Sequence, residues 1–430
     1  MIKELYNKFL NSNCKVSTDT RKISPGSIFF ALKGPNFNAN EFAREALEKG
    51  ANYAVIDDVK FTIKDKTLLV DDVLTCLQQL ALHHRKQFNI PVIGITGSNG
   101  KTTCKELIGA ILNKKSPTLV TEGNLNNHIG VPLTLLQLSS EHQIAIIEMG
   151  ASKSGDIKEL VEIACPTHGY ITNIGKAHIE GFGSIDGVIS TKKELYDYIE
   201  KTNGTIFCNS DDPLLINVLP KKTSIIYFGR SKSYVTGILL ELNPFAVLKW
   251  ECENYQSPII RTNLVGEYNY YNFLSAICIG KTFNVNNNYI NEAISSYQPG
   301  NHRSQVVDTK KNRLIVDCYN ANPSSTKAAL DSFIQIENNN KMVILGDMLE
   351  LGDESTDAHK EINDLIIKNN LKGYLIGKEF GKIKTQITHF DNVALLIEHL
   401  KKQKAIHDFV ILLKGSRGIQ LEKVLDSKIL

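Results

Sequence analysis

The chain has 430 residues, of which 42% are hydrophobic and 22% are charged, and its formal net charge is +3. These values are close to globular averages and exclude a strongly basic surface, so nucleic acid is not an expected partner. No apolar run reaches the roughly 18 residues of a membrane span, and the N-terminus has no apolar stretch of signal-peptide length. We therefore expect a cytoplasmic protein without membrane insertion. The length suggests about three domains at roughly 150 residues each.

Residues 1–87 are expected to form a small α/β domain. Residues 27–32 and 53–57 are apolar runs of strand length, and residues 40–51 predict a helix that closes at a glycine. Residues 73–88 space their apolar side chains by about 3.6 positions, which predicts a further helix. This helix is expected to lead into the second domain.

Residues 88–299 are expected to form a central P-loop ATPase-like domain. Apolar strands alternate here with helices, and uninterrupted apolar runs of this length suit a parallel sheet covered on both faces. "GILLELNPFAVLKWECEN" predicts an antiparallel hairpin that turns at Asn243-Pro244. The strands expected in the parallel sheet are 91–96, 144–148, 169–175 and 205–209.

A second alternation of strands and helices begins near Asn301. It predicts a separate, smaller, doubly wound domain over residues 300–430, which we describe as Rossmann-like. The whole chain is therefore expected to belong to the α/β class, with three domains. The strands expected in this last domain are 313–317, 342–346, 373–377 and 409–415.

A phosphate-binding loop is predicted between the strand that ends at Thr96 and the following helix. Its sequence Gly97-Ser98-Asn99-Gly100-Lys101-Thr102-Thr103 fits the end of the pattern G-x-x-x-x-G-K-[ST]. The first glycine of that pattern would fall on Ile95, so the loop is a variant. Glycines let backbone N–H groups approach phosphate oxygens, and a helix N-terminus favours the same charge. Lys101 is expected to neutralise phosphate oxygens, and Thr102 to bind Mg²⁺.

Other polar residues follow the predicted strands. Glu148 and Asp317 each close an apolar strand, where parallel sheets bind their ligands. Beside the phosphate loop, Glu148 is well placed to hold Mg²⁺, although a strand-end glutamate is in isolation typical of a solvated position. His178, in a glycine-rich loop, and Lys192, at a helix start, are by themselves typical of surface residues. Two α/β domains with polar strand ends predict a ligand cleft between them.

Motifs along nearly the whole chain resemble the Mur ligase family, the ATP-dependent amide-bond-forming enzymes of bacterial cell-wall synthesis. The family's phosphate loop is T-G-[ST]-N-G-K-T-[ST], and "TGSNGKTT" matches it at every position. The other matching motifs are "DTRKISPGSIFFALKG" (19–34), "GNLNNHIGVP" (123–132), "IIEMGAS" (146–152), "TNIGKAHIEGFGS" (172–184), "NSDDP" (209–213), "DCYNANPSS" (317–325), "LGDMLELG" (345–352) and "LLKGSRG" (412–418).

The resemblance implies an ATP site, two Mg²⁺ sites and a set of catalytic residues. Lys192 matches a family lysine that CO₂ converts to a carbamate, which would make it a metal ligand. The implied catalytic residues are Lys101, His178, Lys192 and Arg303. The implied metal ligands are Thr102, Glu148, His178 and Lys192. The implied ATP contacts are Gly97, Ser98, Asn99, Gly100, Lys101, Thr102, Thr103, Asn269, Asn272, Arg303 and Asp317.

The resemblance also implies contacts with the other substrates, and three positions depart from the family pattern. Asn40, Tyr268 and His302 stand where the family often has His, His and Gly, which affects the nucleotide-sugar contact and the ATP pocket. The residues implied for the uridine diphosphate end are Asp19, Thr20, Arg21, Lys33 and Gly34, and those for the muramoyl part are Asn126 and Asn127. Those implied for a dipeptide are Asn320, Asn322, Lys414 and Arg417.

The activity implied is ligation of D-alanyl-D-alanine to UDP-N-acetylmuramoyl-tripeptide through an acyl phosphate, by a monomer. "YNANP", "LGDMLELG" and "KGSRG" favour this over a sister ligase that adds a single amino acid, or a folate-glutamating enzyme. A P-loop nucleotide switch without ligation is the alternative from another class, and the His178 and Lys192 pattern argues against it. The sequence leaves open whether the third residue of the tripeptide is diaminopimelate or lysine.

Overall fold

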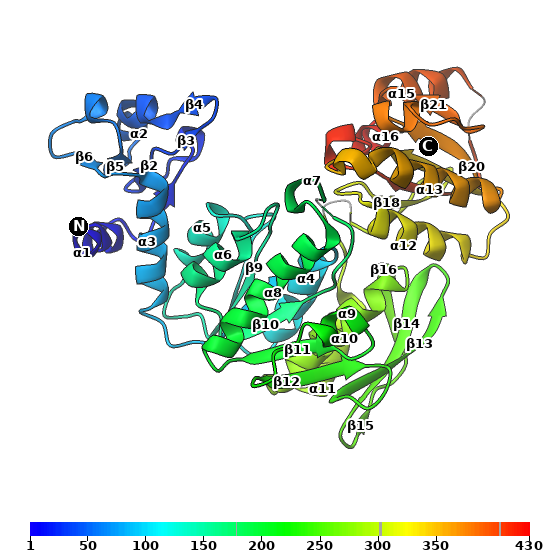
Figure 1. The fold of residues 1–430 in the computed structure, drawn as a ribbon, viewed down its shortest axis with the longest axis horizontal. Helices are drawn as coiled ribbons and strands as arrows, with labels where there is room; N and C mark the ends of the chain where they lie inside the picture. Colours follow the sequence, from blue (N-terminus) through cyan, green and yellow to red (C-terminus); the bar gives the residue numbers. More distant parts are fainter. Residues whose placement is uncertain (178, 301–302, 404–405) are drawn as a thin grey trace.

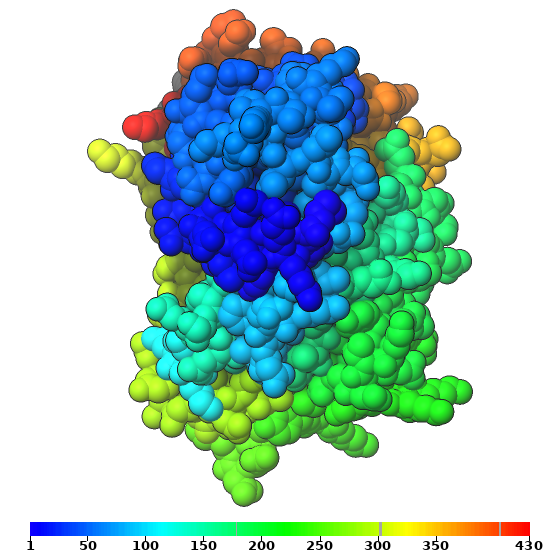
Figure 2. Space-filling view, turned by 90° about the vertical axis from the view of Figure 1, so that its left-hand side faces the viewer, coloured from blue at the N-terminus to red at the C-terminus, as the bar shows by residue number. Residues whose placement is uncertain are grey.

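The computed structural model describes residues 1–177, 179–300, 303–403 and 406–430. Three sheets follow one another along the chain, and the N-terminal and C-terminal parts lie at opposite ends of the middle part (Figure 1). Figure 2, turned so that the N-terminal end faces the viewer, shows the first residues in blue above the green middle part. The sheets fall within residues 1–87, 88–299 and 300–430, and the domain boundaries themselves stay a prediction.

The N-terminal part is a parallel four-stranded sheet with helices on its faces. The strand order is β1-β2-β5-β6, and β3 and β4 form a separate two-stranded hairpin. The strands are β1 (Val16–Ser17), β2 (Ile28–Phe30), β3 (Lys33–Gly34), β4 (Phe37–Asn38), β5 (Tyr53–Ile56) and β6 (Thr67–Leu69), and the helices are α1 (Ile2–Asn11), α2 (Ala43–Glu48) and α3 (Val73–Arg85). Asp72 directly precedes α3, and its side chain accepts a hydrogen bond from the N–H of Thr75 and so caps the first turn.

One continuous apolar core joins this part to the middle sheet. Phe30 and Val55 of the N-terminal sheet, Leu77 of α3 and Ile147 of the middle sheet belong to the same buried cluster. Residues along α3 therefore bury apolar surface on both sides, which couples the two parts by the hydrophobic effect.

The middle sheet is parallel over most of its width and antiparallel at one edge. Its order is β15-β14-β13-β12-β11-β10-β7-β9-β8, with β16 paired to β14. The antiparallel hairpin of β13 and β14 turns at Asn243-Pro244, as predicted. The strands are β7 (Val92–Thr96), β8 (Thr118–Val120), β9 (Ile144–Glu148), β10 (His168–Ile171), β11 (Thr205–Asn209), β12 (Ser224–Gly229), β13 (Val235–Leu242), β14 (Phe245–Cys252), β15 (Tyr255–Gln256) and β16 (Ile260–Val265).

Helices cover both faces of this sheet, which explains its uninterrupted apolar strands. Ile95 of β7 packs into the cluster beneath α4 and α10, whereas Val92 faces the cluster beneath α3, α5, α6 and α8. The helices are α4 (Lys101–Leu112), α5 (Gly130–Leu135), α6 (Asp156–Ala164), α7 (Ile179–Phe182), α8 (Ile185–Lys201), α9 (Pro213–Asn217), α10 (Tyr268–Thr282) and α11 (Asn287–Ser296). No described helix is long and apolar enough to span a bilayer.

The C-terminal sheet has the order β17-β18-β22-β19-β20-β21. Strand β17 is an antiparallel edge that the sequence analysis missed, and the other five strands are parallel. The strands are β17 (Gln305–Asp308), β18 (Arg313–Asp317), β19 (Lys341–Gly346), β20 (Lys372–Ile376), β21 (Thr388–Phe390) and β22 (Val410–Lys414), and the helices are α12 (Pro323–Ile334), α13 (Ser355–Lys368), α14 (Lys378–Gly381), α15 (Val393–Lys402) and α16 (Glu422–Asp426). Helices α12 and α13 cover one face, and α15 and α16 cover the other. The expected α/β class is therefore confirmed.

Candidate active site

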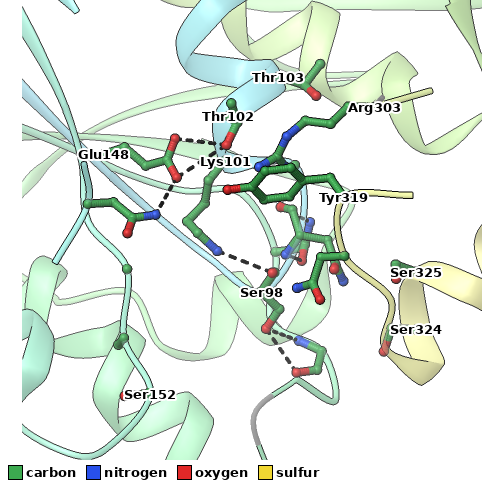
Figure 3. A pocket seen from close by; sticks show the side chains of 18 of the residues that line it. Ser98, Lys101, Thr102, Thr103, Glu148, Ser152, Arg303, Tyr319, Ser324 and Ser325 are labelled. Atoms are coloured by element: carbon green, nitrogen blue, oxygen red, sulfur yellow. Dashed lines mark hydrogen bonds between the residues drawn. The ribbon is translucent and has the colours of Figure 1, made fainter. Parts of the chain in front are cut away.

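A cleft of about 950 Å³ lies between the carboxyl ends of the middle and C-terminal sheets. One wall carries the loop after β7 and the end of β9, and the other carries Tyr319 and Ser324 of the segment that follows β18 (Figure 3). The end of β22 also lies on this second wall. The sequence-predicted residues that line the cleft are Ser98, Asn99, Gly100, Lys101, Thr102, Thr103, Asn126, Asn127, Glu148, Asn269, Asn272, Arg303, Asp317, Asn320 and Lys414.

The phosphate loop needs glycine at its first position. Gly97 has a φ of +142°, and a Cβ atom there would lie 2.0 Å from Oγ1 of Thr172. A side chain at Gly97 would therefore strain the backbone and displace the neighbouring strand end. Lys101 Nζ donates to the carbonyl oxygens of Gly97, over 2.5 Å, and Ser98, over 3.3 Å. The ammonium group thus lies within the curve of the loop, where phosphate oxygens could replace these two carbonyl oxygens as its hydrogen-bond acceptors.

The segment after β10 fixes the shape of this loop from the side. The N–H of Ser98 donates to the Asn173 carbonyl, and the N–H of Asn99 donates to Asn173 Oδ1, each over 3.0 Å. Ser98 Oγ donates to the Gly175 carbonyl over 2.9 Å. These contacts hold the loop in shape.

Glu148 and Thr102 bring oxygen ligands together at the base of the cleft. Oγ1 of Thr102 donates to Oε2 of Glu148 over 3.1 Å, and Asn126 Nδ2 donates to Oε1 over 2.8 Å. The buried ammonium of Lys105 lies 3.6 Å from Oε2. A hydroxyl and a carboxylate beside a phosphate loop are the donor set that Mg²⁺ prefers, so these residues fit that ion.

The described residues do not bring the predicted ligands of a second metal ion together. Within the described ranges, no three His, Cys, Asp or Glu side chains gather as a metal cluster. The predicted ligand His178 lies outside the described residues. Lys192, the other predicted ligand, is on α8, is 2% exposed and does not line the cleft. Burial, and secondarily the charge of Lys101, lowers the pKa of Lys192 to about 7.

The predicted adenine-side pair lies at the start of α10. Asn272 Nδ2 donates to Asn269 Oδ1 over 2.7 Å, and Asn269 Nδ2 donates to the Val265 carbonyl over 2.8 Å. Both amides are buried and line the cleft. Tyr268, a departure from the family pattern, shares a hydrogen bond of 2.9 Å with Ser304. This contact ties α10 to the chain segment that enters the C-terminal sheet.

Two cations of the C-terminal part face the cleft through specific partners. The guanidinium carbon of Arg303 lies 3.6 Å from the ring centroid of Tyr319, a close cation–π contact. Lys414 Nζ donates to Asp317 Oδ2 over 2.6 Å and to the Asn320 carbonyl over 3.2 Å. In this arrangement the ammonium of Lys414 orients Asp317 and the backbone that follows it.

The predicted nucleotide-sugar residues do not line this cleft. Asp19, Thr20, Arg21, Lys33 and Gly34 lie in the N-terminal part, where Lys33 Nζ is 2.8 Å from Asp57 Oδ1. Asn40 is fully buried, and its amide donates to that same oxygen over 2.8 Å. Asn40, one of the three departures from the family pattern, thus holds the Asp57 carboxylate that pairs with Lys33. Asn322 and Arg417, predicted for the dipeptide, also lie outside the cleft lining.

Several cleft residues were not predicted from the sequence. Tyr319 and Ser324 lie within a motif that the sequence analysis noted without giving either of them a role. Lys105 does not line the cleft, but its buried ammonium lies 3.6 Å from Glu148, and it follows Lys101 by one helical turn, a spacing that places both on one face of α4. That spacing could have identified Lys105.

A glycine-rich phosphate loop with a lysine, placed between a buried parallel strand and the N-terminus of a helix, defines the P-loop class of nucleotide-binding proteins. Residues 95–280 match the Mur ligase middle domain, and residues 302–417 match the Mur ligase, glutamate ligase domain. The chain belongs to the Mur ligase family. The chain is an ATP-dependent ligase.

Named relatives cover nearly the full length of the chain. UDP-N-acetylmuramoyl-tripeptide–D-alanyl-D-alanine ligase from Bacillus subtilis is 33% identical over 95% of this chain and 92% of its own. The ligase of the same name from Escherichia coli is 32% identical with the same coverage. The crystal structure of MurF from Acinetobacter baumannii superimposes with a TM-score of 0.87 at 31% identity, over 96% of this chain and 93% of that chain. MurF ligase from Thermotoga maritima in complex with ADP gives 0.85 at 26% identity, over 96% of each chain.

Proposed function

We propose that this chain joins D-alanyl-D-alanine to UDP-N-acetylmuramoyl-tripeptide, with ATP as the energy source, in peptidoglycan precursor synthesis. The observation that carries the proposal is that one cleft holds the phosphate-loop residues Lys101 and Thr102 opposite Asp317 and Asn320 of the "DCYNANPSS" motif. That motif is one of those that separate dipeptide-adding ligases from their sisters. The full-length likeness to ligases of this name supports the same conclusion.

The reaction follows from the charges of the reactants. A carboxylate and an ammonium do not condense at neutral pH, because hydroxide is a poor leaving group. The tripeptide carboxylate therefore attacks the γ-phosphorus of ATP, the bond to ADP breaks, and an acyl phosphate forms. The neutral amine of the dipeptide then attacks the acyl carbon, phosphate leaves, and the amine proton is released. The protein contributes positioning and electrostatic stabilisation.

The residues of the cleft have separate parts in these steps. Lys101 and the loop N–H groups bind the phosphates, and Arg303 approaches the transferred group from the opposite wall. Asn269 and Asn272 bind adenine, and Asp317, oriented by Lys414, binds the ribose side. Mg²⁺ held by Thr102 and Glu148, with a second ion near His178, would offset phosphate charge.

Lys192 is proposed to become a carbamate that completes the second metal site. Carbamate formation requires the neutral amine, which attacks CO₂ and releases one proton. Because burial lowers the pKa of Lys192 to about 7, a substantial fraction of the amine is neutral at physiological pH. The modified side chain would be an anion, which suits a metal site better than an ammonium does.

The other two substrates are proposed to reach the cleft from different parts of the chain, the nucleotide sugar from the N-terminal part and the dipeptide from the C-terminal part. Asp19, Thr20, Arg21, Lys33 and Gly34 hold the uridine diphosphate end in a domain of residues 1–87, and Asn126 and Asn127 approach the muramoyl part. Residues 88–299 then form the ATP-binding domain, and residues 300–430 the domain that supplies Asn320, Asn322, Lys414 and Arg417 to the dipeptide side. The enzyme is proposed to act as a cytoplasmic monomer, which sedimentation at micromolar concentration tests.

The experiment is a reconstituted reaction with ATP, Mg²⁺, D-alanyl-D-alanine and the UDP-linked tripeptide in its diaminopimelate and lysine forms. Phosphate release and product mass are followed while each component is omitted in turn. A pentapeptide that requires every component supports the proposal. Acceptance of single amino acids in place of the dipeptide supports a sister ligase, and slow ATP hydrolysis without co-substrates supports a nucleotide switch.

A further inference from the structure

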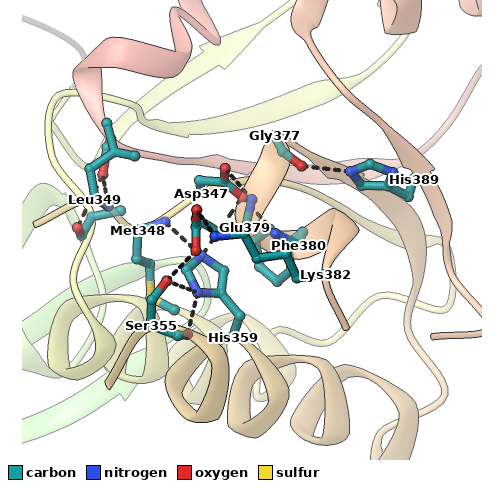
Figure 4. Close-up of polar contacts among 12 residues, drawn as sticks. Asp347, Met348, Leu349, Ser355, His359, Gly377, Glu379, Phe380, Lys382 and His389 are labelled. Carbon is teal, nitrogen blue, oxygen red and sulfur yellow. Dashed lines mark hydrogen bonds and ion pairs between the residues drawn. The ribbon is translucent and has the colours of Figure 1, made fainter. Parts of the chain in front are cut away.

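The "LGDMLELG" motif contributes a buried carboxylate at the end of β19. Asp347 is 2% exposed and accepts the N–H groups of Glu379, over 2.8 Å, and Phe380, over 2.9 Å (Figure 4). Nε2 of His359 accepts the N–H of Met348 over 3.0 Å. These contacts fix the first residues of the loop after β19 to α13 and to the start of α14.

Ser416 of the "KGSRG" motif joins three loops at the carboxyl edge of the C-terminal sheet. Its N–H donates to the Asp347 carbonyl over 3.1 Å. Its hydroxyl accepts the N–H of Leu349 over 3.0 Å and donates to the Ala321 carbonyl over 3.2 Å. Ala321 belongs to the "YNANP" motif and Leu349 to "LGDMLELG", so one buried hydroxyl of "KGSRG" bonds to the other two motifs that set this chain apart from sister ligases.

The residue after Ser416 is an exposed cation beside the cleft. The guanidinium carbon of Arg417 lies 5.6 Å from the ring centroid of Tyr319, which lines the cleft. Among the described residues, no carboxylate forms an ion pair with Arg417. A guanidinium that is not engaged in an ion pair can bind a carboxylate through two parallel hydrogen bonds, provided that its backbone holds the required direction.

We propose that Ser416 is a positioning residue for the acceptor substrate, which rests on the proposed function. The acceptor carries a free carboxylate and a nucleophilic amine. Ser416 holds the loop after β22 against the loops after β18 and β19, so the position of Arg417 relative to Tyr319 and Asn320 is fixed before the acceptor binds. Removing the Ser416 hydroxyl keeps the Arg417 guanidinium but lets its orientation vary.

The test compares Ser416→Ala with the wild-type enzyme and measures KM for all three substrates. Both hydrogen bonds of the hydroxyl are lost, and KM for D-alanyl-D-alanine should rise about tenfold, while KM for ATP and for the tripeptide stays within about twofold. Ser416→Cys keeps a weak donor and acceptor and should give an intermediate value. If the alanine variant does not fold, the cysteine variant is used to compare KM for D-alanyl-D-alanine with KM for ATP and for the tripeptide.

Thr309→Ala is the matched control. Thr309 Oγ1 donates to the Asn312 carbonyl and accepts the N–H groups of Lys311 and Asn312, at the turn before β18 and therefore at the opposite end of the sheet. It should lower thermal stability without changing the ratio of KM values. Equal changes in all three KM values, or none, in the Ser416 variants would overturn the inference. Failure of the wild-type enzyme to use the dipeptide would instead remove the proposed function.

Discussion

Asn322 at the start of α12 donates from Nδ2 to Oδ1 of Asn99 in the phosphate loop, over 2.8 Å. The same side chain caps α12, because its Oδ1 accepts the N–H of Ser325 over 2.9 Å. The N–H of Lys176 donates to Ser324 Oγ over 3.1 Å at the same contact. The start of α12 thus contacts the predicted phosphate loop directly, so opening of the cleft must break these bonds.

Asn322→Ser separates the two roles of this residue. A serine hydroxyl still caps the helix but is too short to reach Asn99, so stability should change by less than about 1 kcal/mol. We expect kcat/KM for ATP to fall about fivefold to tenfold, because one bond that favours the closed cleft is lost. A double-mutant cycle with Asn99→Ala measures the coupling. Strict additivity of the two variants would show that the bond does not contribute to closure.

The kcat of Lys192→Ala should fall at least about a hundredfold. The substitution removes a proposed metal ligand, and even residues that only orient a metal ligand typically contribute about tenfold to a hundredfold. Added formate or acetate should restore part of the activity, because a small carboxylate can occupy the place of the carbamate. Wild-type activity should also fall in CO₂-depleted buffer and recover with bicarbonate.

Lys193→Ala is the control for this prediction. Its ammonium pairs with Asp197 at the surface, one position away from Lys192. Its activity should match the wild type with and without formate. Full activity of Lys192→Ala would exclude the carbamate, and so would a variant that no small carboxylate rescues.

Stability should depend on pH through Lys192. Its pKa is about 7 when folded, against about 10.5 when unfolded, so the unfolded chain binds more protons between these values. The free energy of unfolding should therefore rise with pH from about 7 to about 10.5, and the cost of burying the amine is fully present below pH 7.

Lys192→Met tests this directly in CO₂-depleted buffer without metal. The variant should be more stable than the wild type at pH 7, by up to about 5 kcal/mol, and the difference should shrink as pH rises towards 10. Denaturant unfolding at several pH values measures it. A constant difference across this range would mean that Lys192 is charged in the folded enzyme at every pH tested.

Glu148→Gln should weaken Mg²⁺-dependent nucleotide binding while it leaves metal-free binding of ATP nearly unchanged. The amide keeps the shape of the side chain but removes the anionic oxygens, so kcat should fall by about a hundredfold or more. Titration calorimetry with ATP, in Mg²⁺ and in EDTA, separates the two effects. Glu106→Gln is the control, because its carboxylate bonds the hydroxyl of Tyr297 outside the cleft lining. Equal metal dependence in both variants would contradict the role of Glu148.

The sequence predicted those parts of the site that depend on short stretches of chain. The loop from Gly97 to Thr103 and the strand-end carboxylate Glu148 follow from local glycine spacing and apolar runs. The partners of Arg303 and Asn322 did not follow, because Tyr319 and Asn99 are brought to them by tertiary packing. Strand β17 was missed because it is a partly exposed edge strand without a long apolar run, and only its pairing with β18 makes it a strand.

The shared apolar core around α3 holds the N-terminal sheet at a fixed distance from the middle sheet. Phe30 of the N-terminal sheet and Ile147 of the middle sheet belong to one apolar cluster, so the nucleotide-sugar residues and the phosphate loop cannot move apart freely. In the proposed function, residues of the N-terminal part hold the uridine end and the phosphate loop holds the γ-phosphate, so that only a peptide of the right length presents its carboxylate for attack. The enzyme can then select a tripeptide over a shorter precursor by the length of the peptide, without contacting the residue that the shorter precursor lacks.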